Sequence, residues 1–410
     1  MTSEPEVAYV WIWLPGADTP VVCGRLDPLA QAIGFTYAAS YLARADSVPV
    51  YGPELPLTTG THLPASEQAS GVPLCIHDAM PDSWGRRLIH HRLGELTGEF
   101  GDLTYLLESG SDRIGALDFQ RSPTEYVPRD TDHPTLEQLA RAAELLETGR
   151  PIPPELEPAL LHGTSIGGAR PKALLTDGAR RLIAKFASTT DTYPVVQGEF
   201  VAMSLARRAG IDVAEVSLAK AAGRWALLVE RFDRSTTGTR RRVVSALTIL
   251  GLTPFPEGRY ASYADLTHRI RADFVDAEGT LRELFARIAF NMLCGNSDDH
   301  GRNHAAFITD DEMLALTPAY DLCPQARSGA SAYDLAMAYG EDGRREARLA
   351  SLVDTAHLYL LDRPEAEDVV AHLVASIREH WTEVCDLAHL TTVERDAFWG
   401  RQFMNPAVLS

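Results

Sequence analysis

The sequence predicts a mixed α+β fold, and three observations lead to this prediction. The segment from Lys172 to Ala187 has the pattern of two strands joined at an Asp-Gly turn. An apolar, strand-like run occurs from Trp225 to Phe232. From Tyr263 to the C-terminus the apolar residues instead have helical spacing, for example between Pro364 and Leu387. Strands before a run of helices indicate an α+β protein with a mainly helical C-terminal part.

Length and charge limit the classes of protein that this chain can be. A chain of 410 residues with 45% apolar and 23% charged residues is long enough for two or three globular domains. The 38 Lys and Arg residues stand against 56 Asp and Glu residues, which gives a net charge of −18. Such a surface repels phosphate backbones, so the chain is not expected to bind DNA by itself.

Cysteine usage and hydropathy indicate a cytoplasmic location. The five cysteines are scattered and form no C-x-x-C pair, which is typical of free thiols in a reducing compartment. The N-terminal segment lacks a basic region, and its apolar stretch is shorter than the core of a signal peptide. No segment approaches the roughly 18 apolar residues of a membrane helix, so no membrane contact is expected.

Two proline-rich stretches predict the domain boundaries. Arg121–Pro134 and Arg150–Pro154 have the composition of connectors. Between them, Thr135 and Gln138 form a capping-box pattern ahead of a short amphipathic helix. We therefore predict three parts, which are an N-terminal α/β module at 1–134, an N-lobe at 135–250 and a mainly helical lobe at 251–410.

A glycine-containing loop precedes the predicted hairpin. Gly167 and Gly168 are adjacent and lie just before Arg170 and Lys172, and the second strand of the hairpin carries Lys185. Taken alone, two glycines most often form a turn, and a strand lysine is often a solvated edge residue. The loop and the lysine therefore indicate a function only in combination with the motifs of the C-terminal half of the chain.

The most informative segment is a predicted core helix that ends in a polar loop. Thr280 and Glu283 form a second capping-box pattern, and the helix is expected to end at Gly295. One face of this helix is apolar, which predicts burial, and it carries Leu284, Phe285, Ile288 and Met292. A rigid element therefore presents the polar segment that begins at Asn296.

This polar segment contains residues suited to phosphoryl transfer. Asp298 and Asn303 have the D-x-x-x-x-N spacing of a kinase catalytic loop. Two apolar runs, 305–309 and 313–316, are expected to form a hairpin that brings Asp321 back toward them. The order of these motifs along the sequence is that of a bilobal protein-kinase-like fold. A glycine loop comes first, followed by a lysine-bearing hairpin, an Asp-Asn loop and a later aspartate.

Several longer motifs resemble those of the HipA-like serine/threonine kinases, which are toxin kinases of type II toxin-antitoxin systems. The resemblance extends over nearly the whole chain and is most specific in S-x-G-G-x-R-P-K and G-N-x-D-D-H-x-R-N-H. It is carried by MPDSW at 80–84, LESGSDRIGAL at 107–117, SIGGARPKALL at 165–175, 199–213, LVERFDR at 228–234, 245–252, GNSDDHGRNHAAF at 295–307 and LTPAYDL at 316–322.

The resemblance implies ATP and Mg²⁺ as cofactors and a role for each site residue. Asp298 would be the catalytic base, and Asn303 and Asp321 would complete the catalytic set and hold Mg²⁺. Ser165 matches a loop serine whose autophosphorylation ejects the loop and inactivates the kinase. The nucleotide would be bound by Gly167, Gly168, Ala169, Arg170, Pro171, Lys172, Lys185, His300 and Tyr320, with Glu230, Arg231 and Phe232 as the hinge against adenine.

The resemblance also implies partners. A small helix-turn-helix DNA-binding antitoxin would restrain the kinase, and DNA would be contacted only through this antitoxin. The substrate would be a protein, such as a translation factor or a tRNA synthetase. Arg170, Pro171 and Asp299 match the wider family more than its best-known toxin, so these finer properties are implied least directly.

Two alternatives from other classes remain open on the residues alone. The first is a metal-dependent phosphohydrolase built on Asp298, Asp299, His300, His304 and Asp321. His300 and His304 have the i, i+4 spacing of zinc ligands but lack the Glu of H-E-x-x-H, and Gly301 disfavours a helix between them. The second alternative is a catalytically idle binding protein that keeps the kinase fold.

Overall fold

The computed structural model describes residues 7–30, 32–64, 71–95, 98–254 and 257–410, and the chain divides into two compact units. The first unit contains the chain up to Thr189 together with Lys220–Val244 and Phe307–Glu312. The second unit contains Thr190–Ala219, Ser245–Ala306 and Met313–Ser410. Because each unit is assembled from separate segments, the three-part division at 134 and 250 stays a prediction.

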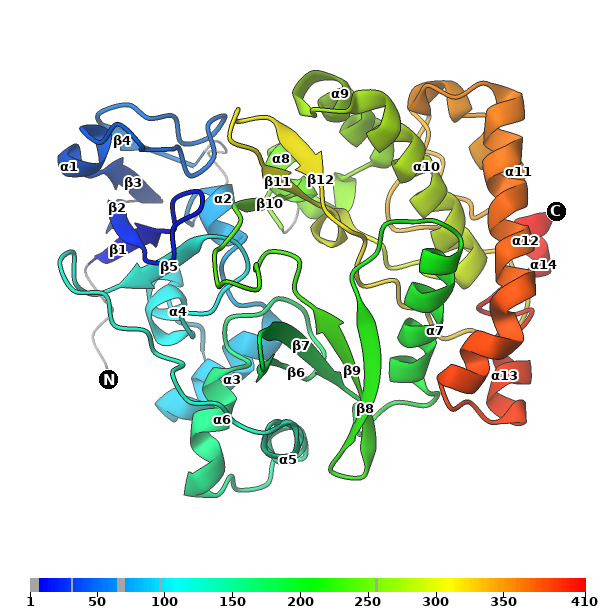
Figure 1. Ribbon diagram of the computed structural model, residues 1–410, viewed down its shortest axis with the longest axis horizontal. Helices are drawn as coiled ribbons and strands as arrows, with labels where there is room; N and C mark the ends of the chain where they lie inside the picture. The colour runs from blue at the N-terminus through cyan, green and yellow to red at the C-terminus, as the bar shows by residue number, and fades with distance from the viewer. Residues whose placement is uncertain (1–6, 31, 65–70, 96–97, 255–256) are drawn as a thin grey trace. The chain divides into compact units, whose positions relative to one another are not determined.

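The first unit begins with an antiparallel sheet in the strand order β4-β3-β2-β1-β5 (Figure 1). The strands of this sheet bury Val10, Leu26, Phe35 and Phe119 completely. The strands are β1 (Ala8–Ile12), β2 (Val21–Pro28), β3 (Ile33–Tyr37), β4 (Thr61–His62) and β5 (Leu117–Gln120). The helices between β3 and β5 are α1 (Ala39–Leu42), α2 (Leu74–His77), α3 (Ser83–Leu93) and α4 (Asp102–Glu108).

A second sheet contains the predicted hairpin, which is confirmed. Its strand order is β6-β7-β9-β8, and Gly178 has a φ of +60° at the turn between β6 and β7. The strands are β6 (Lys172–Asp177), β7 (Arg180–Phe186), β8 (Val216–Ala221) and β9 (Arg224–Glu230). Helix α5 (Leu136–Glu147) has the predicted capping box at Thr135 and precedes η1 (Pro154–Leu156) and α6 (Glu157–Leu161). Trp84, Leu139, Leu160 and Phe186 join α3, α5, α6 and β7 in one core.

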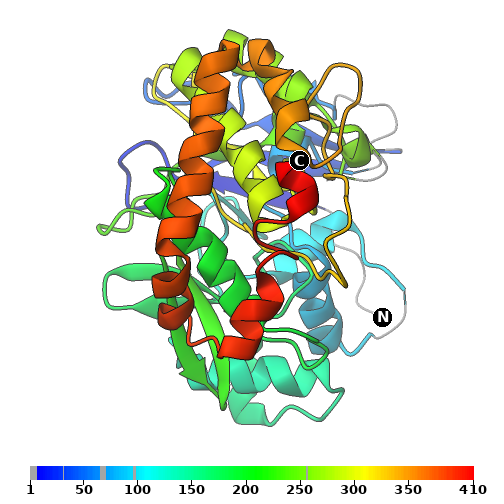
Figure 2. The ribbon, with the colours of Figure 1, turned by 90° about the vertical axis from the view of Figure 1, so that its right-hand side faces the viewer.

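The second unit is mainly helical, as predicted. Its longest helix, α12 (Arg363–Leu387), packs against α7 (Val195–Arg208) and α10 (Ala277–Cys294), as Figure 2 shows. The other helices are α8 (Ala246–Leu250), η2 (Glu257–Tyr260), α9 (Tyr263–Asp273), η3 (Gly301–Asn303), α11 (Leu349–Val353), η4 (Ala356–Tyr359), α13 (Thr392–Phe398) and α14 (Pro406–Leu409). The mixed α+β fold class is therefore confirmed.

Helix α10 begins earlier than the sequence pattern predicted. The capping box at Thr280 is wrong, because Asp276 is the N-cap and its side chain accepts a 3.0 Å hydrogen bond from the Gly279 amide. An upstream carboxylate can satisfy the free amides of a first turn, so the helix extends by one turn. The end at Gly295 and the buried face are confirmed, and Leu284, Phe285, Ile288 and Met292 are fully buried.

The short strands after α10 confirm the second predicted hairpin. β11 (Ala305–Ile308) lies between β10 (Val243–Ser245) and β12 (Leu314–Leu316) in a three-stranded sheet. The hairpin places Asn303 just before β11 and Asp321 just after β12. Among the helices that the structure describes, none combines the length and apolar character needed to cross a membrane.

Candidate active site

The glycine loop is bound to the start of α3. The Gly168 amide donates a 2.6 Å hydrogen bond to Oδ2 of Asp82, and the Gly168 carbonyl accepts one of 3.2 Å from the Trp84 amide. Gly168 has a φ of +101°, and a Cβ there would lie 2.2 Å from Nζ of Lys172. A side chain at this position would strain the backbone and would require the end of Lys172 to shift, so the positive φ is what makes the loop require glycine.

Two lysines lie directly opposite each other behind this loop. Lys172 of β6 is the register partner of Lys185 of β7, so both side chains project from the same face of the sheet. Nζ of Lys172 donates a 2.7 Å hydrogen bond to the carbonyl of Gly167, which directs it toward the loop. Two ammonium groups on one face of the sheet, beside the glycine loop, are cationic donors of the kind that phosphate oxygens accept hydrogen bonds from. The pair therefore suits a phosphate-bearing ligand.

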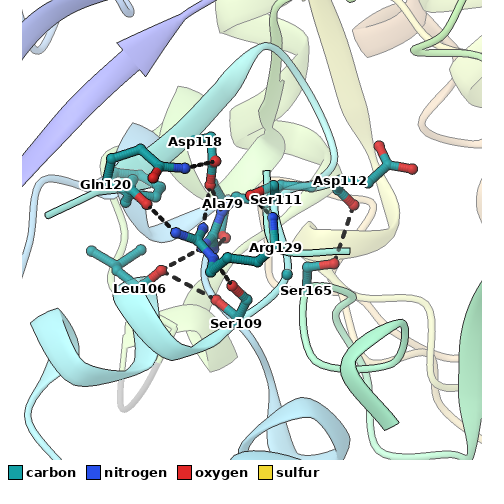
Figure 3. A network of polar contacts seen from close by, with 12 residues as sticks. Ala79, Leu106, Ser109, Ser111, Asp112, Asp118, Gln120, Arg129 and Ser165 are labelled. Atoms are coloured by element: carbon teal, nitrogen blue, oxygen red, sulfur yellow. Dashed lines mark hydrogen bonds and ion pairs between the residues drawn. The ribbon is translucent and has the colours of Figure 1, made fainter. Parts of the chain in front are cut away.

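Ser165 is buried inside the first unit. The residue is only 3% exposed, and its hydroxyl donates a 3.1 Å hydrogen bond to the carbonyl of Asp112 (Figure 3). Thr164 also fixes the loop, because its hydroxyl oxygen accepts a 2.8 Å hydrogen bond from the Gly110 amide. In this conformation the Ser165 hydroxyl is shielded from solvent, so a phosphoryl donor can reach it only after the loop moves.

The predicted hinge residues lie where β9 ends. Glu230 is the last residue of β9, and the Arg231 amide donates a 2.9 Å hydrogen bond to the carbonyl of Arg181. The Arg231 guanidinium is buried and forms ion pairs with Asp112 and Asp233. Phe232 packs edge-on against Phe307 at 5.7 Å between ring centroids. Any contact of Arg231 with a nucleotide therefore falls to its backbone.

A buried network of charges surrounds the end of β9. Arg231 and Arg234 both pair with the carboxylates of Asp112 and Asp233 at 2.7 to 2.9 Å. Burial alone would raise the pKa of Asp233, but the adjacent arginines outweigh burial and hold that pKa below its ordinary value. The Asp233 carboxylate also accepts a 2.8 Å hydrogen bond from the Gly115 amide. The network fixes the backbone that leads out of β9.

A second cluster of ion pairs continues from Asp112 toward the first sheet. The Asp118 carboxylate is fully buried and accepts hydrogen bonds from Arg113 at 3.0 Å, Arg129 at 2.6 Å and Gln120 at 2.9 Å (Figure 3). These contacts hold the 107–117 motif against the first sheet. They thereby fix the carbonyl of Asp112 that receives Ser165.

The loop from Asp298 to Asn303 in the second unit exposes one aspartate and buries the next. Asp298 is exposed, whereas Asp299 is 2% exposed. Oδ2 of Asp299 accepts hydrogen bonds from the Tyr263 hydroxyl, from Nδ2 of Asn291 at 2.6 Å and from Nε2 of His304 at 2.8 Å. Burial disfavours the charged carboxylate, but His304 and the other donors together hold the pKa of Asp299 below its usual range. Asp299 therefore anchors the loop that presents Asp298.

Asn303 and Asp321 come from segments that touch. The Tyr320 hydroxyl donates a 2.7 Å hydrogen bond to the carbonyl of Arg302, which joins the residues adjacent to the two expected metal ligands. Asp321 has a φ of +60°, a backbone conformation that is uncommon outside glycine. An amide and a carboxylate oxygen fit Mg²⁺, which is usually bound by one or two protein ligands together with substrate phosphates. The donor set thus fits a Mg²⁺-nucleotide.

The two histidines of the loop do not act together. His300 is exposed, whereas His304 is buried and directs Nε2 at Asp299. In the described part of the chain, no group of three or more His, Cys, Asp or Glu side chains is arranged to hold a metal ion. A zinc site of the H-x-x-x-H kind therefore has no structural support.

Sequence reasoning missed several residues that support the site. Most belong to motifs that the family resemblance had singled out without a role, which was the available signal. Asp82 and Trp84 belong to the 80–84 motif and hold the glycine loop. Asp112 belongs to the 107–117 motif and receives Ser165. Three further supporting residues belong to the second unit. Tyr263 and Asn291 donate hydrogen bonds to Asp299 and lie outside the motifs. Asn296 lies within a motif and donates a hydrogen bond to Asn291.

Three features together are those of a kinase-like protein. They are the mixed α+β fold, the glycine loop with its lysine pair in the first unit, and the Asp298–Asn303 loop with Asp321 in the second unit. The chain belongs to the HipA-like kinase family. A family model for the HipA-like C-terminal domain matches residues 164–381, which is more than half of the chain. A model for the HipA N-terminal domain matches residues 16–120.

Individual relatives agree with this assignment. A putative kinase, Y4mE of Sinorhizobium fredii, is 28% identical over 325 residues, which cover 71% of each chain. The serine/threonine-protein kinase toxin HipA of Shewanella oneidensis is 25% identical over 311 residues, which cover 65% of this chain and 70% of that protein. A solved structure of Shewanella oneidensis HipA with HipB and operator DNA matches with a TM-score of 0.68 over 92% of both chains. Its sequence identity is 21%, so this match supports the fold.

Proposed function

We propose that this protein is a Mg²⁺- and ATP-dependent serine/threonine protein kinase that acts as the toxin of a toxin-antitoxin pair and is inactivated by autophosphorylation at Ser165. The observation that carries the proposal is the pairing of Lys172 with Lys185 behind the Gly167–Gly168 loop. Two cations at opposite strand positions, next to a loop that requires glycine, favour a ligand with several phosphates.

The second unit supplies the groups that phosphoryl transfer needs. Asp298 is exposed, so its carboxylate can accept the hydrogen of an attacking hydroxyl. Asn303 and Asp321 would hold Mg²⁺, which neutralises charge on the phosphates when it is bound. Asp299 keeps the loop in place because its buried carboxylate accepts three hydrogen bonds. Transfer then depends mainly on positioning, which this loop provides.

The proposed partner is a small helix-turn-helix antitoxin. The related HipA of Shewanella oneidensis occurs in a complex with HipB and operator DNA. A net charge of −18 disfavours direct contact with DNA, so the antitoxin would make most DNA contacts. The proposed substrate is a protein, such as a translation factor or a tRNA synthetase.

The structure gives less support to the two alternative functions. A phosphohydrolase built on the Asp298–His304 loop would need Asp299 and His304 as metal ligands, but these two side chains are buried and bonded to each other. An idle scaffold would be expected to lack a catalytic group, and every group named for the kinase is present in the sequence.

Incubation of the purified protein with γ-labelled ATP and Mg²⁺ tests the proposal. We expect label to enter the protein itself, to require Mg²⁺ and to be abolished by EDTA. Free labelled phosphate without labelled protein would instead identify a phosphohydrolase. If nucleotide neither binds nor reacts, the protein is a scaffold. The Asp298→Asn variant, purified in parallel, controls for a contaminating kinase.

A further inference from the structure

We propose that Asn291 and Asn296 are positioning residues that couple the catalytic loop to the metal-holding Asp321. This inference rests on the proposed kinase function and deepens it. Neither asparagine would touch substrate or nucleotide. Their function would be to keep the base at Asp298 and the Mg²⁺ ligand at Asp321 in one fixed arrangement.

An unbroken chain of hydrogen bonds supports the proposal. Nδ2 of Asn291 donates to the Asp299 carboxylate at 2.6 Å, and Oδ1 of Asn291 accepts from Nδ2 of Asn296 at 3.0 Å. Nδ2 of Asn296 also donates to the backbone carbonyl of Asp321 at 3.5 Å. These hydrogen bonds thus link Asp299, which is adjacent to Asp298, to the backbone of Asp321 through the side chains of Asn291 and Asn296.

Burial makes this chain sensitive to substitution. Asn291 is fully buried, and Asn296 and Asp299 are 1% and 2% exposed. Bulk water therefore cannot readily replace a lost partner, and an unsatisfied buried amide or carboxylate costs more than a hydrogen bond at the surface. Asn291 must donate with its nitrogen and accept with its oxygen at the same time. An asparagine side chain can do both, whereas a leucine of similar shape can do neither.

The end of α10 determines where Asn296 lies. Gly295 has a φ of +71°, and a Cβ there would lie 2.7 Å from the carbonyl oxygen of Gln402. The Asn296 amide then donates a 2.9 Å hydrogen bond to the carbonyl of Asn291 in the last turn of α10. Both backbone and side chain therefore fix Asn296 to the helix, which gives the chain of hydrogen bonds a rigid base.

Asp321 needs such support because of its backbone conformation. A left-handed conformation at a residue other than glycine is disfavoured and persists only where the surroundings hold it. The hydrogen bond from Asn296 to the Asp321 carbonyl is one such contact. If it is lost, Asp321 is expected to relax toward a commoner backbone conformation, and its carboxylate would then move away from the Mg²⁺ position.

The test is a Mg²⁺ titration of ATP binding, measured by calorimetry, for wild type and Asn296→Ala. We expect the Mg²⁺ concentration at half-saturation to rise about tenfold in the variant, because a hydrogen bond and the support of a strained residue are both lost. ATP binding without Mg²⁺ should change little. Asn405→Ala is the matched control, because Asn405 is also fully buried but bonds to Ser331, Arg401 and Ala407.

A double-mutant cycle shows whether the effect passes through Asp321. In an Asp321→Asn background, Asn296→Ala should cause little further change in the Mg²⁺ requirement. If Asn296→Ala does not fold, Asn296→Ser keeps one donor and should give an intermediate shift. A Mg²⁺ requirement that stays within about twofold of wild type, or that shifts equally in Asn405→Ala, would overturn the inference. If wild type shows no Mg²⁺-dependent ATP binding, the proposed function fails first.

Discussion

The Gly168 amide donates a 2.6 Å hydrogen bond to the carboxylate of Asp82. Asp82 is the residue before α3, and Trp84 in the first turn of α3 returns a hydrogen bond from its amide to the Gly168 carbonyl. The 80–84 motif therefore binds both the amide and the carbonyl of Gly168. Removal of the Asp82 carboxylate should release the glycine loop to a measurable extent.

Asp82→Ala should loosen the glycine loop. Loss of a charged acceptor from the Gly168 amide removes one of the contacts that keep Ser165 buried. We expect faster hydrogen exchange over residues 165–170 and faster autophosphorylation at Ser165, measured by mass spectrometry. Asp46→Ala is the control, because Asp46 is an exposed aspartate paired with Arg44. Unchanged exchange in Asp82→Ala would show that the hydrogen bond does not hold the loop.

Asp298→Asn should reduce phosphoryl transfer by orders of magnitude and change nucleotide affinity little. The substitution keeps the shape of the side chain but removes the carboxylate that orients the nucleophile. Single-turnover transfer and calorimetric ATP binding measure the two effects separately. Asp311→Asn, at an exposed aspartate before β12, should match wild type in both. Near-normal transfer in Asp298→Asn would remove Asp298 from the mechanism.

Asp321→Asn should weaken ATP binding chiefly in the presence of Mg²⁺. An amide is a poorer Mg²⁺ ligand than a carboxylate, because it carries no charge. Calorimetry with and without Mg²⁺ should therefore show a loss that is confined to the Mg²⁺ arm. An equal loss in both arms would indicate a general disturbance of the site and would contradict a metal-binding role.

Ser165→Ala should abolish the major autophosphorylation signal and leave ATP binding intact. Ser165 is buried, so its modification requires the loop to leave its position, and the added phosphate carries about −1.5 to −2 charge that opposes its return. The alanine variant should remain active for longer than wild type in ATP. Mass spectrometry identifies the site. A dominant phosphosite elsewhere, with Ser165 unmodified and activity persisting, would refute this mode of regulation.

Asp233→Asn should destabilise the first unit by about 3 to 5 kcal/mol, because it leaves the buried Arg231 and Arg234 with one carboxylate fewer. The folded state holds the pKa of Asp233 below its ordinary value of 3.8. The stabilisation that the charged Asp233 carboxylate gives to the folded state is therefore complete above that pH. This stabilisation is lost as the pH falls further, because Asp233 is protonated at a higher pH in the unfolded state than in the folded state. Urea unfolding between about pH 3 and 7 should show a shallower acid dependence in Asp233→Asn than in wild type. Equal slopes would contradict the assignment.

Local sequence patterns determined the elements that carry the site. Helix α10 could be predicted up to Gly295 because its apolar face and its terminal glycine are encoded in neighbouring residues. The β6-β7 hairpin could be predicted for the same reason, since alternation and the turn at Gly178 are local. The start of α10 could not, because the predicted capping box at Thr280 has the right local pattern, whereas the folded chain uses Asp276 as the N-cap one turn upstream.

Tertiary structure decided what each polar residue does. Asp298 and Asp299 are adjacent and chemically identical, yet one is exposed and the other is buried among Tyr263, Asn291 and His304. Likewise, the Arg231 guanidinium belongs to a buried ion-pair network rather than to a nucleotide site. Periodicity predicts which face of an element is apolar, because that preference acts on each residue separately. The partner of a buried charge comes from a distant part of the sequence, so only the folded chain can determine it.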